Sequence, residues 1–270
     1  MTVVRLIWDQ LDWVQLPAAR LKRSERRVQQ INMEDYKLKA TNPQQYDSPE
    51  LDWRIGGDIN SPSRIFFRDN LRQHLEDLGG KSVLDIGSGV GHLFSMLQEL
   101  KASNIEAIEP SKRNVEYSRN LYPNITIYED TLQSFVSEKQ FDVAICIMVF
   151  EHILDIKDAF SRIANIIKPG GSFYFIFGDK GFHSLNNLPE TEVDVQEIGD
   201  GVVATKTIRH RQGIDSTMYD IFRPVEFFIN NAKESGFDIE KHVELMAAQN
   251  GYKSFWANKP ICHLLVLKRL

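Results

Sequence analysis

A glycine-rich turn between an apolar strand and a helix is the first feature of this sequence that could do chemistry. The segment 83–91 reads Val-Leu-Asp-Ile-Gly-Ser-Gly-Val-Gly, with Gly87, Gly89 and Gly91 in the turn. Glycines let the backbone approach a ligand closely, and the helix that follows offers its N-terminal amides as donors. Glu109 stands at the end of the next expected strand, where a carboxylate can accept both hydroxyls of a ribose.

Three interpretations of this turn compete. In the first, the glycines only turn the chain between a strand and a helix. In the second, the turn binds a dinucleotide, but the pattern G-x-G-x-x-G needs glycine at its sixth position, where His92 stands. This disfavours a nicotinamide-dependent dehydrogenase. In the third, the turn binds S-adenosylmethionine, which has no pyrophosphate, and Asp85 just before the turn faces the cationic amino group of that cofactor.

The elements that must position these residues follow one another in a regular order. From about Ile65 to Phe177, short apolar runs alternate with amphipathic stretches, which is typical of βα units on a parallel sheet. The segment 141–147 is apolar on both faces and is expected at the centre of the sheet. Ser111 is expected to cap a helix, and Asp-Gly within 199–201 predicts a hairpin. We predict strands at 82–86, 105–108, 125–128, 141–147, 172–177, 193–198, 202–208, 237–244 and 261–267, and helices at 92–100, 111–121, 155–167 and 224–235.

Four segments resemble, in order, motifs of the class I S-adenosylmethionine-dependent methyltransferases. They are 83–91, Ile-Glu-Pro-Ser at 108–111, Phe-Asp-Val-Ala-Ile-Cys-Ile-Met-Val-Phe-Glu-His-Ile at 141–153 and Lys-Pro-Gly-Gly at 168–171. The resemblance covers residues 61–270 and implies an α/β fold, a Rossmann-like doubly wound sheet of seven strands with a C-terminal antiparallel hairpin. Residues 1–60 would be an N-terminal extension or cap, and an insertion at about 181–222 would be a lid that covers the substrate.

The resemblance also implies how the cofactor is held, with S-adenosylhomocysteine as the product. Asp85, Gly87 and Gly89 would hold the methionine part, and Glu109 would accept the ribose hydroxyls. Arg64 is a candidate for binding the methionine carboxylate. Asp130 and Thr131 would lie at the adenine edge, and Ile147 would line the far side of the cofactor. The remaining residues of the expected site lie within the same motifs: Ser88, Gly91 and Pro110.

The end of the segment 141–153 bears on the methyl acceptor. Phe150-Glu151-His152 resembles the corresponding end in small-molecule O-methyltransferases of ubiquinone biosynthesis. Some of those enzymes bind a metal through Glu-x-x-Glu-His, but Met148 holds the first carboxylate position here, so no metal is expected. His152 is then either a general base that takes a proton from the acceptor or a residue that packs the loop after the strand. Positioning of the reactants alone could also suffice.

Residues outside the motifs have open roles. Three aromatic residues precede the glycine turn and either close over the cofactor or pack in the core: Tyr46, Trp53 and Phe66. The expected lid carries polar side chains that face either the acceptor or solvent: His183, His210, Tyr219 and Asp220. Basic clusters at 20–27 and 206–211 either bind an anionic group or form solvated faces.

Composition narrows the class of protein. The 270 residues include 42% hydrophobic side chains, with 16 Phe and 4 Trp, which exclude intrinsic disorder as the dominant state. The formal net charge of −5 disfavours a nucleic-acid substrate. Cys146 and Cys262 are too few for a disulfide scaffold, and the longest apolar run, Val143 to Phe150, is too short to span a membrane. We therefore expect a cytoplasmic protein that is a monomer or a homodimer.

Together, the residues and the resemblance predict an S-adenosylmethionine-dependent methyltransferase. It would transfer a methyl group to an oxygen or nitrogen of a small molecule by in-line displacement. Methylation of RNA or protein is an alternative that would use the basic clusters. A cofactor-binding protein without transfer activity is a further alternative.

Overall fold

The computed structural model describes residues 33–47, 62–179, 191–211, 214–246 and 260–270. The chain divides into a unit of residues Met1–Met33 and a unit of residues Glu34–Leu270, and both sheets lie in the second unit. Trp53, His183 and the basic cluster at 20–27 fall outside the described residues. The expected boundary between extension and catalytic domain, near residue 60, also falls outside them.

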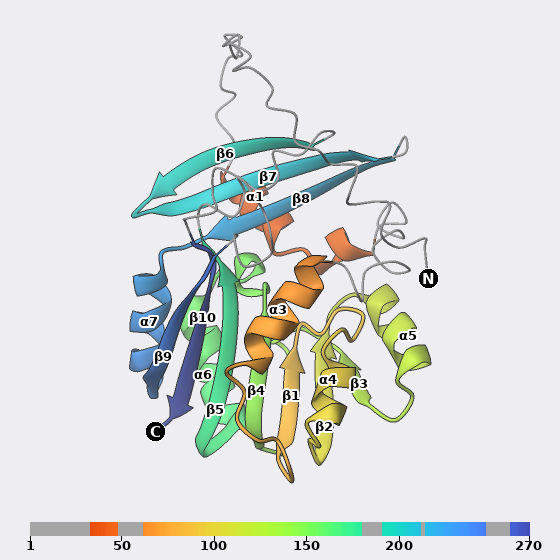
Figure 1. Cartoon of the computed structure of the whole chain (residues 1–270). Helices are drawn as coiled ribbons and strands as arrows, with labels where there is room; N and C mark the ends of the chain where they lie inside the picture. Colours follow the sequence, from red (N-terminus) through yellow and green to blue (C-terminus); the bar gives the residue numbers. More distant parts are fainter. Residues whose placement is uncertain (1–32, 48–61, 180–190, 212–213, 247–259) are drawn as a thin grey trace, which may run out of the picture. The chain divides into compact units, whose positions relative to one another are not determined.

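A seven-stranded sheet forms the centre of the second unit, in the order β3-β2-β1-β4-β5-β10-β9 (Figure 1). The first five strands in chain order run parallel, and β10 runs antiparallel to both of its neighbours. This confirms the predicted doubly wound sheet with its C-terminal antiparallel hairpin. The strands are β1 (Ser82–Ile86), β2 (Asn104–Glu109), β3 (Thr126–Glu129), β4 (Phe141–Ile147), β5 (Ile167–Gly178), β9 (Phe237–Met246) and β10 (Pro260–Arg269).

The sheet has a point at which its winding reverses. Strands β1 and β4 are neighbours, but β2 and β3 lie beyond β1 on one side, whereas β5 lies beyond β4 on the other. The helical connections on the two sides of such a point diverge, and a crevice is left outside the carboxyl ends of the strands. The fold therefore offers a ligand site at the ends of β1 and β4.

Apolar side chains pack on both faces of the sheet. Val143 and Ile145 of β4 face one core cluster, together with residues of α3, α4 and α5. Ala144 and Cys146 face the other, which holds α6, α7 and a group of phenylalanines. Full burial of side chains of this kind stabilises the fold by about 1.5–3 kcal/mol each. The helices are α3 (Pro62–Arg72), α4 (Phe94–Glu99), α5 (Lys112–Leu121), α6 (Ile156–Ile166) and α7 (Val225–Glu234).

A second, three-stranded antiparallel sheet lies beyond the carboxyl ends of the parallel strands (Figure 1). It consists of β6 (Thr191–Gly199), β7 (Val202–Arg211) and β8 (Ile214–Phe222), and we call it the lid sheet. The predicted Asp-Gly hairpin joins its first two strands, and Asp200 and Gly201 adopt positive φ of 51° and 73°. Strand β8 contacts a short 3-10 helix, η3 (Phe150–His152), which follows β4.

The segment before the glycine turn packs on the lid sheet. We call residues 34–47 the strap; it contains most of α1 (Met33–Ala40) and the 3-10 helix η1 (Pro43–Tyr46). The Tyr36 hydroxyl donates to the carbonyl oxygens of Thr205 and Asp220, the latter at 3.0 Å. The Tyr36 ring meets that of Tyr219 edge-on, with centroids 5.4 Å apart.

The 3-10 helices η1 and η3, helix α3 and strand β8 were not among the predicted elements. Helix α3 lies at the start of the alternating pattern noted from about Ile65, and β8 lies in the insertion expected at about 181–222, where only two strands were predicted. On β8 the polar side chain of Ser216 is buried beside Met218, so the strand lacks a clean alternation of apolar and polar residues. Where the pattern is clean the prediction is confirmed, as at Ser111, whose side chain accepts from the Asn114 amide at the start of α5.

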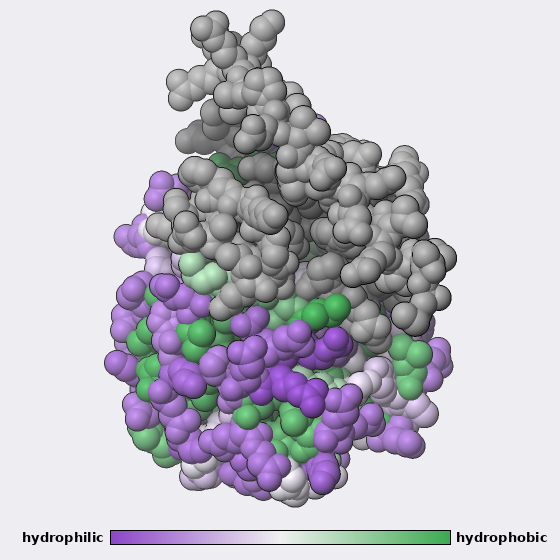
Figure 2. All heavy atoms as spheres, in the orientation of Figure 1, coloured by the Kyte–Doolittle hydropathy of each residue, from purple (hydrophilic) through white to green (hydrophobic). Residues whose placement is uncertain are grey.

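The described surface is mixed in polarity. On the face shown in Figure 2, hydrophilic and hydrophobic side chains are interspersed over the lower part of the molecule. Scattered apolar side chains of this kind are normal on a protein surface. None of the described helices is long and apolar enough to cross a membrane.

Candidate functional site

The glycine turn lies at the carboxyl end of β1, at the point where the winding of the sheet reverses. Gly87, Gly89 and Gly91 have φ of +72°, +56° and +81°, a region that only glycine adopts easily. The amides of Gly87 and Ser88 both donate to the Ile108 carbonyl of β2, at 2.8 and 3.2 Å. A side chain at Gly87 would place its Cβ 2.3 Å from a methyl carbon of Val149. The local backbone and its packing therefore both require the glycine.

Glu109 is bound directly to this turn. One carboxylate oxygen accepts from the Gly89 amide at 2.8 Å, and the other accepts from the Ser111 amide at 2.9 Å and the Asn114 side chain at 3.2 Å. The side chain is 5% exposed. Burial raises the pKa of Glu109, and the donated hydrogen bonds offset part of that effect. The predicted meeting of the acid and the glycine turn is thus present in the fold.

Three buried polar atoms around the turn have no hydrogen-bond partner among the described residues. They are a carboxylate oxygen of Asp85, the Ser88 hydroxyl and Nδ1 of His92. Burial, with the nearby charge of Glu109, raises the pKa of Asp85 to about 8. A buried polar group left unpaired costs about 1–3 kcal/mol, so a cluster of such atoms requires an explanation. A polar ligand with a cationic group beside Asp85 would fit this set of donors and acceptors.

Arg64 lies half-buried on α3. Burial lowers the pKa of His92, and the charges of Arg64 and Arg68 lower it further. The structure thus places Arg64 near the glycine turn, which no motif in the sequence required.

The residues expected at the adenine edge follow β3. The Asp130 amide donates to the Glu109 carbonyl at 3.3 Å, which brings them beside the end of β2. The Asp130 carboxylate accepts from the Thr131 amide at 2.8 Å and from the Ser134 hydroxyl. Ile147 is buried at the end of β4, and Pro110 is half-buried after β2. These residues therefore all lie at the same edge of the sheet as the glycine turn.

Met148 shows a backbone conformation that the sequence does not reveal. Its φ is +55°, and its amide donates to the Ile176 carbonyl at 2.8 Å. A left-handed conformation costs a residue other than glycine about 1–3 kcal/mol, and such residues concentrate at functional sites. Methionine has no preference for this conformation, so no local signal could have identified it. No group of three or more His, Cys, Asp or Glu side chains in the described part of the chain is arranged to hold a metal.

His152 lies between the strap, η3 and the lid sheet. Its Nε2 is 2.5 Å from the Tyr46 hydroxyl and 3.6 Å from a carboxylate oxygen of Asp220. Its Nδ1 is 3.1 Å from the Ala40 carbonyl oxygen. The structure thus brings together three candidates that the sequence offered separately. Phe66 instead packs in the core, 3% exposed, and the His210 side chain lies outside the described set.

Two buried charged side chains hold η3 in place. Glu151 accepts from the Gly178 amide at 2.7 Å, and burial raises its pKa to about 7. The Arg223 guanidinium donates to the carbonyls of Phe150 at 3.0 Å and Ile153 at 2.7 Å. Burial lowers the pKa of Arg223 to about 10. Sequence reasoning missed the role of Arg223, because its partners lie about 70 residues earlier in the chain.

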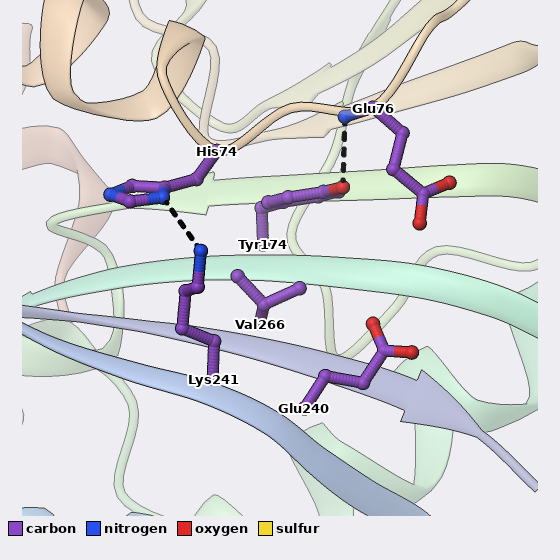
Figure 3. Close-up of a pocket in the computed structure, with 6 residues that line it drawn as sticks. All are labelled: His74, Glu76, Tyr174, Glu240, Lys241 and Val266. Atoms are coloured by element: carbon purple, nitrogen blue, oxygen red, sulfur yellow. Dashed lines mark hydrogen bonds between the residues drawn. The ribbon is translucent and has the colours of Figure 1, made fainter.

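A small pocket elsewhere on the molecule contains none of these residues. It has a volume of about 180 Å³ and lies over β5, β10 and β9 (Figure 3). Within it, the Tyr174 hydroxyl accepts from the Glu76 amide at 3.3 Å, and Nζ of Lys241 lies 3.3 Å from Nδ1 of His74. The six lining residues are His74, Glu76, Tyr174, Glu240, Lys241 and Val266.

Comparison with known proteins places this geometry in context. Residues 63–197, half of the chain, match a family described as "Methyltransferase domain". The chain is 25% identical over 129 residues to "Ubiquinone biosynthesis O-methyltransferase" of Rickettsia bellii (strain OSU 85-389), covering 44% of this chain and 53% of that protein. It is 30% identical over 122 residues to the mitochondrial protein of the same name from Dictyostelium discoideum, covering 40% and 38%. The chain thus spans about half the length, or less, of these curated relatives.

Solved structures share the fold. An S-adenosylmethionine dependent methyltransferase from Mesorhizobium loti has a TM-score of 0.55 at 20% identity, covering 80% of this chain and 100% of that one. The glycopeptide N-methyltransferase MtfA, complexed with S-adenosylmethionine, has a TM-score of 0.54 at 15% identity, covering 76% and 93%. At these identities the likeness shows a shared architecture.

Proposed function

The chain belongs to the methyltransferase-domain family, and from this membership we propose that it is an S-adenosylmethionine-dependent methyltransferase acting on a small molecule. The observation that carries the proposal is the contact between Glu109 and the Gly89 amide beside the unpaired carboxylate oxygen of Asp85. S-adenosylmethionine has a ribose and a cationic amino group, which are the groups that these two acids would bind.

Different residues around the turn would bind different parts of the cofactor. Asp85 would bind the amino group, and Arg64 would bind the carboxylate of the methionine part. Glu109 retains acceptor capacity for one of the two ribose hydroxyls, because a carboxylate has about four lone-pair sites and accepts three hydrogen bonds here. Asp130 and Thr131 would lie at the adenine edge. The remaining contacts would come from Gly87, Ser88, Gly91, Pro110 and Ile147.

The acceptor would be a small molecule bound between the turn and the lid sheet. The curated relatives are named O-methyltransferases, which supports an oxygen acceptor, and the net charge of −5 gives no support to RNA. The cofactor would supply a methyl group on a sulfonium for in-line displacement. His152 would act as the proton acceptor, since it lies on η3, has an acidic neighbour in Asp220, and follows Val149, which packs against the glycine turn.

We place the protein in the cytoplasm, as a monomer or homodimer. Cys146 and Cys262 are both buried free thiols, which suits a reducing compartment.

Calorimetric titration with S-adenosylmethionine tests the proposal. Wild type should bind the cofactor, and Glu109→Ala should weaken binding by about 10- to 100-fold, because a hydrogen bond to a charged group contributes about 1.5–3 kcal/mol. Gly89→Asp should abolish binding, since a carboxylate would stand beside Glu109. The matched control is Glu129→Ala. Glu129 is an exposed acid on β3, opposite Glu109 in the register of the two neighbouring strands. Binding of NADH in place of S-adenosylmethionine would contradict the proposal.

A further inference from the structure

The strap crosses the carboxyl edge of the sheet above the glycine turn. The carboxylate of Asp47 accepts from the Ser111 hydroxyl at 2.6 Å, just after β2. The preceding residue, Tyr46, contacts His152, just after β4. Since β1 lies between β2 and β4 in the sheet, these two consecutive residues bracket the glycine turn at the end of β1.

The strap is also fixed to the lid sheet. The Gln45 side chain accepts from the Tyr219 amide at 3.3 Å and donates to the Ala40 carbonyl at 3.2 Å. Tyr36 donates to backbone carbonyls of β7 and β8. Tyr46 is therefore held from both sides, and its hydroxyl has a defined place beside His152.

The nearer of two contacts at Nδ1 indicates the tautomer of His152. The Gln45 side-chain nitrogen lies 3.4 Å from Nδ1, but the Ala40 carbonyl, which can only accept, lies closer at 3.1 Å. We therefore assign the proton to Nδ1. In the neutral ring Nε2 is then the acceptor, and the Tyr46 hydroxyl at 2.5 Å donates to it. The Asp220 carboxylate, 3.6 Å from Nε2, would stabilise the ring once it is protonated.

We propose that the methyl acceptor is a hydroxyl group and that Tyr46 is the residue that contacts it, passing its proton to His152. This inference rests on the proposed function. The acceptor hydroxyl would donate to the Tyr46 oxygen, which keeps lone pairs while its own proton points at His152. As the acceptor oxygen forms its bond to the methyl carbon, the carbon–sulfur bond breaks and its electron pair stays on sulfur. The acceptor proton moves to Tyr46, and the Tyr46 proton moves to Nε2 of His152, giving an imidazolium beside Asp220.

The three residues of this relay have different roles. Tyr46 touches the acceptor and is the catalytic residue. His152 and Asp220 act through Tyr46 and are positioning residues, which modifies the direct base expected of His152. An amine acceptor would need no such relay when it is already unprotonated, so the arrangement favours oxygen over nitrogen.

Nitrogen-15 NMR of labelled histidine tests the relay without any acceptor. In wild type the His152 ring should be the Nδ1-protonated tautomer, with an Nε2 signal typical of a hydrogen-bonded imine nitrogen. Tyr46→Phe should move that signal toward the position of a free imine nitrogen. The control Tyr122→Phe removes a hydroxyl that pairs with Ser95 and should leave it unchanged. A proton on Nε2 in wild type, or no response to Tyr46→Phe, would overturn the proposal.

Formation of S-adenosylhomocysteine supplies the second measurement, with simple phenols and catechols and the corresponding anilines as probes. Tyr46→Phe and His152→Gln should each lower kcat on the hydroxyl probes by about 10²- to 10⁴-fold. The double variant should lose no more than either single one, because the two residues act as a unit. Turnover confined to anilines, or an unchanged kcat in Tyr46→Phe, would refute the relay while leaving the proposed function intact. Failure of wild type to bind S-adenosylmethionine would instead refute the proposed function.

Discussion

The buried carboxylates at the carboxyl edge of the sheet differ in the number of hydrogen bonds that they accept. Glu109 accepts three hydrogen bonds, whereas Glu151 accepts one from the Gly178 amide and has a second oxygen without a partner among the described residues. Asp85 keeps an oxygen without a partner among the described residues, and its pKa is raised to about 8, mainly by burial. A cation beside the Asp85 carboxylate would therefore stabilise its charged form, and the amino group of the proposed cofactor would provide that cation.

Binding of S-adenosylmethionine should release a proton from Asp85. At about pH 6.5 the carboxyl is protonated in the free protein, since its pKa is about 8, and a bound ammonium group would favour the carboxylate. Up to one proton should leave per ligand, and affinity should rise with pH until about pH 8. Calorimetry in buffers of different ionisation enthalpy measures the release, which Asp85→Asn should remove and Asp130→Asn should retain. An equal release from Asp85→Asn would contradict this assignment.

The same raised pKa affects the stability of the free protein. Between about pH 4 and pH 8 the folded state holds a proton on Asp85 that the unfolded chain has lost. The free energy of unfolding therefore falls as pH rises across this window. The cofactor site thus lowers the stability of the free protein, in keeping with the unpaired polar atoms around it.

At the scale of elements, the glycine turn and η3 are shaped to fit each other. Val149, just before η3, packs against the position where Gly87 lacks a side chain. Arg223 and Glu151 fix η3 from the lid side and from the end of β5. The close approach of the turn to η3 therefore sets the distance between the expected cofactor loop and His152.

Gly87→Ala should destabilise the protein in two separable ways. The positive φ alone costs about 1–2 kcal/mol for a residue with a Cβ, and overlap with Val149 should add about 1–3 kcal/mol. Gly80→Ala is the control for the first effect, because Gly80 has φ of +78° and no described atom lies within 4 Å of the place that its Cβ would take. In the Val149→Ala background, the loss in free energy of unfolding caused by Gly87→Ala should fall to the loss that Gly80→Ala causes.

Chemical denaturation of the four members of this double-mutant cycle measures the coupling. If Val149→Ala leaves the cost of Gly87→Ala unchanged, the contact between the turn and η3 does not constrain the glycine.

At the scale of the whole described unit, the two sheets differ in how deeply they are buried. Strands β4 and β5 are buried along most of their length, whereas much of β6 is exposed. Segments with few buried contacts open at lower free energy than core strands. Strands β7 and β8 carry buried side chains such as Ala204 and Phe222, and contacts with the strap add to these, of which the Tyr36 hydroxyl makes two.

Tyr36→Phe should loosen the lid sheet without weakening the main sheet. Loss of the hydroxyl should lower the opening free energy of β7 and β8 by about 0.5–1.5 kcal/mol, because the carbonyls of Thr205 and Asp220 lose the one donor that they share. Hydrogen exchange should show faster exchange of those amides and unchanged exchange in β1, β4 and β5. Tyr122→Phe is the control, since its hydroxyl pairs with Ser95 away from the lid. A uniform loss of protection in every strand would show that the two sheets open together.

Much of the fold could be predicted because its signals are local. The fully apolar segment 141–147 is the central strand β4, and Ser111 caps α5 as expected. Helix α4 begins at Phe94 rather than at the expected His92, since the turn continues through Gly91. Strand β8 was not predicted because the polar residue Ser216 is buried on it. The pattern of buried and exposed residues along this strand therefore differs from its pattern of apolar and polar residues.

The sequence by itself determined the elements, their order and the chemistry of the glycine turn. Apolar periodicity and the need for glycine at positive φ act over a few residues, so they can be read directly from the chain. Only the tertiary structure decided which distant polar residues meet. Tyr46 and His152 are 106 residues apart, and the Tyr36 ties to β7 and β8 span 169 and 184 residues. Such contacts arise from the packing of whole elements, and no local pattern encodes them.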